Sequence, residues 1–236
     1  MAEVLFMLIS DTEGACAKLA LKVSEHFSMG FDGVVGVAYP QEELMMARGW
    51  IENVIDQNVL LGNGFSLYFG DKEGEFVVGD VLQMVEHELK YYDMVPGFGW
   101  SVQVDNVYLG DDEICDSKVI GIIDTETAYI EAHEDVIGHI TNNLMVDPQC
   151  MNLDQLPDIT FNIAGDFYTF SPKDYVWKST EEDQEVCRMG IRAANHPEYL
   201  IKFGTIFLKK YYTHFNLRNR NIGFAEASRD KLDIFE

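Results

Sequence analysis

Basic residues are scarce in this sequence. Its 236 residues include 17 lysines and arginines against 40 aspartates and glutamates, which gives a formal net charge of -23 at pH 7. A chain this acidic repels phosphate backbones and anionic lipid headgroups, so we expect neither nucleic acid nor a membrane surface as a partner. The acidity suits a protein that works at low pH, where protonated carboxyls repel one another less. It equally suits a protein that is only kept soluble by its charge.

Long apolar runs and cysteines are also few. No run approaches the ~20 residues that a membrane-spanning helix needs. The apolar residues 1–9 have no basic flank and meet Asp11 almost at once, so they predict a strand rather than a signal peptide. The four cysteines are too few for a disulfide scaffold, although one bridge is plausible.

Several motifs of catalysis and cofactor binding are missing. The sequence has no Walker A loop, no Gly-x-Ser-x-Gly elbow and no Cys-x-x-Cys pair. His133, Glu134 and His139 lack the His-Glu-x-x-His spacing that aligns two imidazoles on one helical face, which favours exposed helical histidines over a zinc site. We therefore predict no metal and no cofactor.

The chain does contain many short β-rich runs separated by Gly, Asp and Asn, which predict a largely antiparallel, all-β protein. Residues 63–64 and 164–166 carry turn signals between strands. Helical spacing of apolar residues occurs at 50–57 and 133–144. The β-rich runs are residues 65–69, 76–78, 100–104, 119–123, 159–163 and 167–170.

One segment carries an arrangement suited to acid–base chemistry. Residues 119–127, Val-Ile-Gly-Ile-Ile-Asp-Thr-Glu-Thr, form an apolar strand that runs into an Asp-Thr turn. Such a turn aims one carboxylate, Asp124, off the end of a buried strand, where hydroxyls and backbone N–H groups can hold it to activate a water. Asp-Thr also closes many ordinary turns, so this segment alone favours a structural role.

Taken with other segments in the same order, this turn resembles the pepsin-like aspartic protease family (peptidase family A1). The resemblance implies an all-β, pepsin-like acid-protease fold with a complete C-terminal lobe and a truncated N-terminal lobe. Residues 1–62 are then a remnant of the N-terminal lobe, and 63–236 form the central sheet and the C-terminal lobe. The matching segments are residues 31–40, 65–69, 74–79, 100–109, 119–127, 156–161, 171–176, 203–216 and 221–225.

The resemblance also implies a catalytic arrangement. Members of this family use two aspartates, one per lobe, which share a proton and hold a water that attacks the peptide bond. Asp124 corresponds to the second of them. Thr125 would anchor the loop, Thr127 would hydrogen-bond the outer carboxylate oxygen, and Gly204, with Phe203, would pack behind the turn.

Further consequences of the resemblance concern the other lobe, the cysteines and the compartment. Gly36 would back the catalytic turn of the N-terminal lobe, together with Val35. Cys150 and Cys187 lie where the family has the disulfide of its C-terminal lobe; two free thiols are the alternative. Cys115 has lost its family partner, because Val119 stands there. The family is secreted or lysosomal/vacuolar, whereas this sequence predicts no signal peptide, which leaves the compartment open.

Two departures from the family pattern bear on activity. Glu126 replaces the glycine of Asp-Thr-Gly, adding bulk and a second negative charge beside Asp124. The resemblance also implies that most of the N-terminal lobe is absent, including the segment of the first catalytic aspartate. Asp11, followed by Thr-Glu-Gly, mimics a second Asp-Thr turn, but it lies much closer to Gly33 than Asp124 does to Gly204. A strand and loop following the flap is the interpretation we favour for it.

These observations lead to three functional hypotheses. The chain is an aspartic endopeptidase by family, acting on peptide or protein substrates but impaired or inactive as it stands. Alternatively, it is a non-catalytic pseudoprotease that binds a peptide or a protein partner. A partial gene product is the third hypothesis; exposed interlobe surface would then favour a dimer or a partner that supplies the missing lobe.

Overall fold

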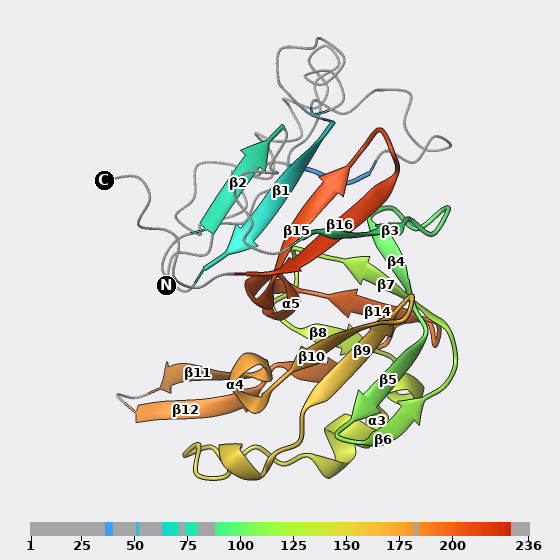
Figure 1. The fold of residues 1–236 in the computed structure, drawn as a ribbon. Coiled ribbons are helices and arrows are strands. Elements are labelled where there is room, and N and C mark those ends of the chain that lie inside the picture. The colour runs from blue at the N-terminus through green and yellow to red at the C-terminus, as the bar shows by residue number, and fades with distance from the viewer. Residues whose placement is uncertain are drawn as a thin grey trace. The chain divides into compact units, whose positions relative to one another are not determined.

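The computed structural model describes residues 36–39, 51, 63–70, 74–79, 88–181 and 184–227. Strands dominate this part of the chain and helices are short, so the predicted all-β class is confirmed (Figure 1). All six runs predicted as β-rich lie in or overlap strands. The predicted strand at residues 1–9, and all of the helix predicted at 50–57 except the helical residue Ile51, lie outside the described residues.

The chain groups into two compact units. The first contains residues 1–100 and 211–236, and the second contains residues 101–210. The boundary predicted between residues 62 and 63 falls at the edge of a described segment and stays a prediction.

The first unit contains a five-stranded antiparallel sheet, ordered β2-β1-β15-β16-β3. Its core is aromatic: the ring of Phe65 stacks on Phe215 at 4.6 Å, and Trp100 meets both rings edge-on. Gly64 opens a strand and pairs with Asn216, so the turn predicted at residues 63–64 is wrong. The strands are β1 (Gly64–Phe69), β2 (Gly74–Val78), β3 (Lys90–Asp93), β15 (Tyr211–Asn216) and β16 (Asn221–Glu226).

The second unit contains the sheet that carries the Asp-Thr turn, ordered β13-β8-β14-β7-β4. β14 pairs parallel with β7 and antiparallel with β8, and β13 pairs parallel with β8. Along β7 the residues alternate between buried and half-buried, as expected for a strand that packs one face on a core. These strands are β4 (Ser101–Val104), β7 (Val119–Ile123), β8 (Ile130–Ala132), β13 (Ile191–Ala193) and β14 (Leu200–Phe203).

The same unit contains a four-stranded antiparallel sheet, ordered β10-β9-β5-β6, and a separate hairpin, β11-β12. Ala164 and Gly165 form the two-residue loop between β9 and β10, both with positive φ (51° and 89°), so the turn predicted there is confirmed. The strands are β5 (Asn106–Leu109), β6 (Asp112–Cys115), β9 (Ile159–Ile163), β10 (Asp166–Phe170), β11 (Val176–Glu181) and β12 (Gln184–Met189).

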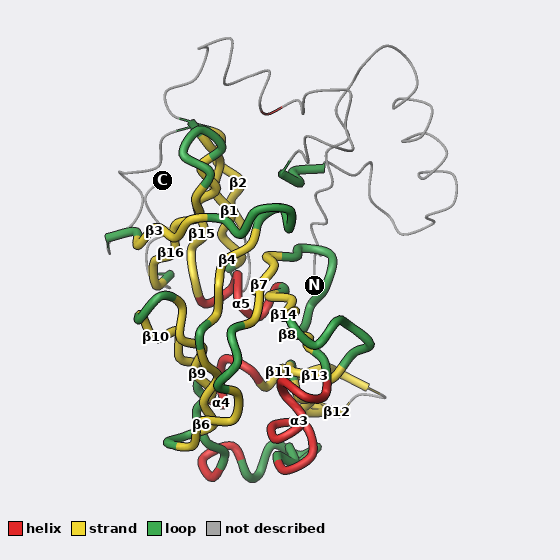
Figure 2. Tube along the Cα trace, turned by 90° about the vertical axis from the view of Figure 1, so that its right-hand side faces the viewer, coloured by secondary structure: helices red, strands yellow, loops and turns green. Residues whose placement is uncertain are grey.

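The helix predicted at residues 133–144 is confirmed as α3 (Glu134–Asn143). The His133 ring accepts a hydrogen bond from the backbone N–H of Asp135 and caps the helix, while Leu144 ends it. Figure 2 shows how little helix the described chain contains; the other helices are η1 (Leu153–Gln155), α4 (Pro172–Tyr175) and α5 (Thr205–Lys210). Within the described residues, no helix is long and apolar enough to span a membrane.

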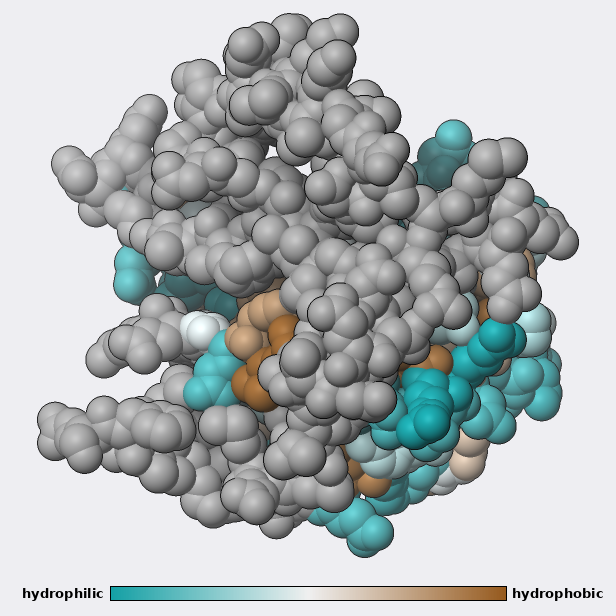
Figure 3. Space-filling view, turned by 90° about the horizontal axis from the view of Figure 1, so that it is seen from above, coloured by the Kyte–Doolittle hydropathy of each residue, from teal (hydrophilic) through white to brown (hydrophobic). Residues whose placement is uncertain are grey.

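The described surface that is visible in Figure 3 is mainly hydrophilic, with small hydrophobic areas between the polar residues. This surface agrees with the strongly negative charge of the whole chain, because charged side chains stay in water unless they are paired.

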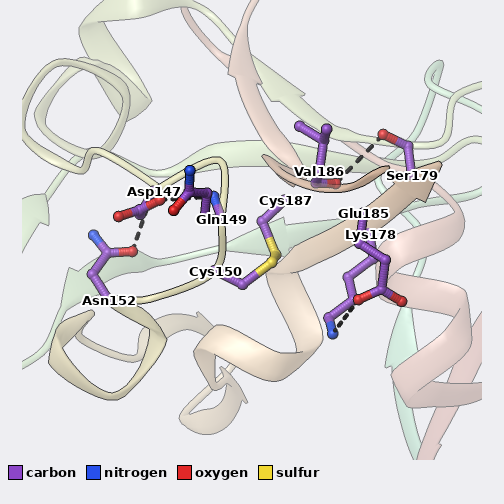
Figure 4. Close-up of a disulfide and its surroundings, with 9 residues drawn as sticks. All are labelled: Asp147, Gln149, Cys150, Asn152, Lys178, Ser179, Glu185, Val186 and Cys187. Carbon is purple, nitrogen blue, oxygen red and sulfur yellow. Dashed lines mark hydrogen bonds and ion pairs between the residues drawn. A yellow bond between two sulfur atoms is a disulfide. The ribbon is translucent and has the colours of Figure 1, made fainter. Parts of the chain in front are cut away.

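The predicted disulfide between Cys150 and Cys187 is confirmed (Figure 4). It joins the loop after α3 to β12 across a sequence separation of 37, with the two Cα atoms 5.4 Å apart. Backbone hydrogen bonds support both ends, from Cys150 N to the Asp147 carbonyl and from Cys187 N to the Pro148 carbonyl. Cys115, predicted to lack its family partner, is a free, half-buried cysteine.

Removing this bridge tests its contribution to stability. We expect the double variant Cys150→Ser/Cys187→Ser to lose about 3–4 kcal/mol of unfolding free energy, because an open loop of this length gives the unfolded chain more freedom. Denaturant titration measures the loss, with Cys115→Ser as the matched control. A double variant as stable as the control would contradict this prediction.

Candidate active site around Asp124

Asp124 follows β7 directly, and its turn is held by backbone hydrogen bonds. Its N–H donates to the carbonyl of Phe203 on the neighbouring strand β14, at 3.0 Å. Its Oδ1 accepts the N–H of Glu126 at 2.9 Å, which closes the turn through the aspartate side chain. One bond therefore holds the backbone of Asp124 and the other holds its carboxylate, and the Asp124 side chain is 14% exposed.

Gly204 lies directly behind this turn. Its N–H donates to the Tyr129 carbonyl at 3.0 Å, and the next N–H, of Thr205, donates to the Thr127 carbonyl at 2.9 Å. A Cβ atom on Gly204 would lie 2.3 Å from both of these carbonyl oxygens. Only glycine allows so close an approach of two backbone segments.

Lys202 is the residue that the sequence analysis missed. It lies on β14 between the buried residues Ile201 and Phe203, and its Nζ donates to Asp124 Oδ2 at 2.7 Å. The hydrogen bond from the Lys202 ammonium to Asp124 raises the pKa of Lys202, and the negative charges of Asp124, Glu131 and Glu126 add to this effect against the opposing effect of burial. A lysine beside the backing glycine, in an otherwise apolar strand, was the available signal in the sequence.

A second ionic cluster surrounds Glu131 on β8, whose side chain is only 8% exposed. Its Oε1 accepts Arg192 Nε at 2.7 Å and a further bond from Arg192 Nη2. The Thr127 hydroxyl donates to the same oxygen at 3.2 Å, and His196 Nε2 lies 3.1 Å from Oε2. Burial raises the pKa of Glu131, but the bonds from His196, Arg192 and Thr127 outweigh it and hold that pKa below its usual value.

The two threonines of the turn differ from the roles implied by the family resemblance. We expected Thr127 to bond the carboxylate of Asp124, but its hydroxyl instead donates to Glu131 and accepts the N–H of Tyr129. The reason is that β8 places the Glu131 carboxylate within reach of this hydroxyl. The anchoring role predicted for Thr125 stays a prediction.

Glu126 has less effect on the turn than its bulk suggests. Its side chain is exposed, and it is not among the described residues with positive φ, so its backbone conformation does not require glycine. Its N–H makes the bond to Asp124 that any residue here could make. The effect that remains is electrostatic, through its charge near Lys202.

Gly36 belongs to the first unit, while Val35 and Asp11 lie outside the described residues.

The helix-capping His133 does approach two carboxylates, and its ligand atom lies within 4.8 Å of those of Asp135 and Glu198. Its Nδ1 already accepts the Asp135 N–H, and the positive end of a helix disfavours a cation, so the metal-free prediction is unchanged.

A β-rich unit with an aspartate turn backed by a glycine defines the chain as related to the aspartic proteases, and sequence comparisons agree. A sequence model of the family described as eukaryotic aspartyl protease matches residues 8–227. The chain belongs to this family. It is 27% identical to renin of Rattus norvegicus and to cathepsin D of Homo sapiens, and 26% identical to pepsin A of Sus scrofa. Each alignment covers 84% of this chain but only 53–54% of the relative, so the chain spans about half the length of these curated relatives.

The close packing of Gly204 can be tested with one methyl group. Gly204→Ala should destabilise the protein by about 2–4 kcal/mol, because the added Cβ must push apart two backbone segments that cannot yield like a flexible side chain. Denaturant titration measures the change. Gly138→Ala, in the interior of α3, is the control, and it should leave stability unchanged or raise it by about 1 kcal/mol. Equal effects at the two glycines would contradict the prediction.

The lowered pKa of Glu131 makes a pH-dependent contribution to stability. Its contribution should be fully present above its unfolded value, 4.5, and should be lost as pH falls through the lower folded value. We therefore expect Glu131→Gln to be less stable than the wild type at neutral pH, with the difference shrinking as pH falls below 4.5. Denaturant titrations across this range measure it, and Glu88→Gln, an exposed position, is the control. A difference independent of pH would refute this expectation.

Proposed function

We propose that this chain is an aspartic-type endopeptidase by descent whose Asp124 site is catalytically impaired. The observation that supports the proposal is the ion pair between Lys202 and Asp124, in which Nζ and Oδ2 are 2.7 Å apart. This ion pair should lower the catalytic activity of the site, because peptide hydrolysis needs the Asp124 carboxyl group to exchange a proton.

Hydrolysis by an aspartate pair depends on one proton shared between two carboxyl groups. The ionised carboxylate takes a proton from the attacking water, and the protonated carboxyl polarises the carbonyl of the peptide bond. Lys202 puts an ammonium on the oxygen of Asp124, and an ammonium only donates hydrogen bonds. It cannot share a proton as a carboxyl does, and it neutralises the charge that would accept the water's proton.

The environment of Lys202 strengthens this pairing. Its raised pKa keeps the ammonium charged throughout the acidic and neutral range. Its side chain is 32% exposed, so water screens the pair only in part. Glu126, exposed beside the turn, adds negative charge that favours the same charged lysine.

A non-catalytic role is the second candidate, and the same ion pair favours it. With Lys202 bound to its carboxylate, Asp124 keeps the shape of its turn but does not take a proton from water. Such a site would bind a peptide or a segment of a partner protein rather than cleave it.

The disulfide supports an oxidising compartment for this protein, such as the extracellular space or a lumen, because structural bridges persist where thiols are not kept reduced. Cys187 is buried, which protects the bridge from exchange with small thiols.

Cleavage of a denatured protein at acid pH, about 3–5, tests the proposal, since this is where an aspartate pair can share a proton. We expect no cleavage by the wild-type chain that is sensitive to a transition-state-analogue inhibitor of aspartic proteases. Binding of that inhibitor, measured by calorimetry, would support the peptide-binding role.

The variants Asp124→Asn, Lys202→Met and Lys178→Met complete the experiment. Lys178 forms an exposed ion pair with Glu185 and serves as the control for loss of a lysine. Inhibitor-sensitive cleavage by the wild type that disappears in Asp124→Asn would overturn the proposal of an impaired site.

A further inference from the structure

Four charged residues alternate in sign across the sheet of the second unit. Lys202 on β14 pairs directly with Glu131 on β8, and Glu131 pairs directly with Arg192 on β13. Residues directly opposite one another on neighbouring strands point to the same face, with Cβ atoms about 5 Å apart. Asp124 follows the strand on the other side of β14, where Lys202 pairs with Ile122. We name Asp124, Lys202, Glu131 and Arg192 the charged row.

Lys202 therefore has two carboxylates within reach but uses one. Its Nζ is hydrogen-bonded to Asp124, whereas Glu131 acts on it only through its charge. Neighbours in direct cross-strand register would ordinarily form an ion pair when they carry opposite charges. The reason that Lys202 does not bond Glu131 must lie in what already occupies that carboxylate.

Both oxygens of Glu131 are occupied from the other side. Arg192 binds Oε1 through Nε and Nη2, and His196 Nε2 lies 3.1 Å from Oε2. The Arg192 guanidinium carbon lies 4.0 Å from the centre of the Tyr129 ring, and this cation–π contact helps to hold the guanidinium in position. A buried carboxylate with these partners, and the Thr127 hydroxyl in addition, has little capacity for a further cation.

We propose that Glu131 is the positioning residue of this site: because Arg192 and His196 saturate its carboxylate, Lys202 is directed to Asp124. This inference rests on the proposed function only in taking the Lys202–Asp124 pair as the inhibitory contact. It adds that the pair depends on residues at the far end of the charged row, which do not touch Asp124. Removing Arg192 opens Oε1 of Glu131, and Lys202 then exchanges one carboxylate for the other.

The partner of Lys202 can be identified from its own titration. The pKa of the Lys202 side chain is followed by NMR through its ε-methylene signals, assigned by their loss in Lys202→Met. In the wild-type background, Asp124→Asn should lower this pKa by about one pH unit and Glu131→Gln should change it less. In the Arg192→Met background the order should reverse: Glu131→Gln should lower the pKa of Lys202 more than Asp124→Asn does.

Three further variants sharpen this test. The Arg192 side chain is 54% exposed, so its replacement by methionine leaves no buried cavity and the variant should fold. His196→Met, which has no hydrogen-bond donor, opens the other oxygen of Glu131 and provides an independent test of the same exchange. Arg192→Lys keeps a cation on Oε1 and should restore the wild-type dependence on Asp124. Arg188→Met, on an exposed position of β12, is the control for loss of one positive charge.

If Asp124→Asn still gives the larger decrease in both the Arg192→Met and His196→Met backgrounds, the positioning role of Glu131 is overturned. The readout is the pKa of Lys202 rather than proteolysis. Proteolysis by the wild-type chain would refute the proposed function but would not change the pKa of Lys202. Failure of the proposed function and failure of the positioning role of Glu131 are therefore distinguishable.

Discussion

The close approach of Gly204 to the carbonyl oxygens of residues 127 and 129 is the constraint on which the candidate site depends. Two hydrogen bonds, from Gly204 and Thr205, attach β14 to the turn that follows β7. A third, from Asp124 N to the Phe203 carbonyl, completes the contact. With these bonds in place, the Asp124 carboxylate has one position, and every residue of β14 has a defined distance from it. Lys202, two positions before Gly204, is thereby placed within hydrogen-bonding distance of the Asp124 carboxylate.

The charged residues of the site interact with one another as a group and not only as separate ion pairs. Asp124 and Glu131 are both mostly buried acids, and each is neutralised by cations from neighbouring strands. A buried carboxylate without such partners would be costly, since desolvation disfavours its charged form. Lys202 and Arg192 therefore serve stability as well as any chemistry. The ion pair that occupies Asp124 is also the one that relieves the cost of burying it.

The family resemblance could be read from the sequence because it depends on the order and spacing of local segments, and the disulfide was expected only as a consequence of that resemblance. The strand at 119–123, the helix at 134–143 and the turn at 164–165 also follow from local patterns of apolar residues and glycine. The turn expected at 63–64 failed because a glycine next to an asparagine can equally open a strand when a distant strand, β15, pairs with it. Thr127 failed for a similar reason, since its partner Glu131 reaches it only through the fold.

The class of fold and the position of the Asp124 turn followed from the sequence, because both depend on short-range patterns of residues. The glycine behind the turn was expected from the family resemblance. The sequence also showed that position 126 is a glutamate, although the turn tolerates this residue. The partner of the Asp124 carboxylate, Lys202, could be found only from the packing of strands that are distant in the sequence. Asp124 and Lys202 are far apart in the chain and meet because β7 and β14 pair in parallel, and strand register across such a distance cannot be read from local sequence.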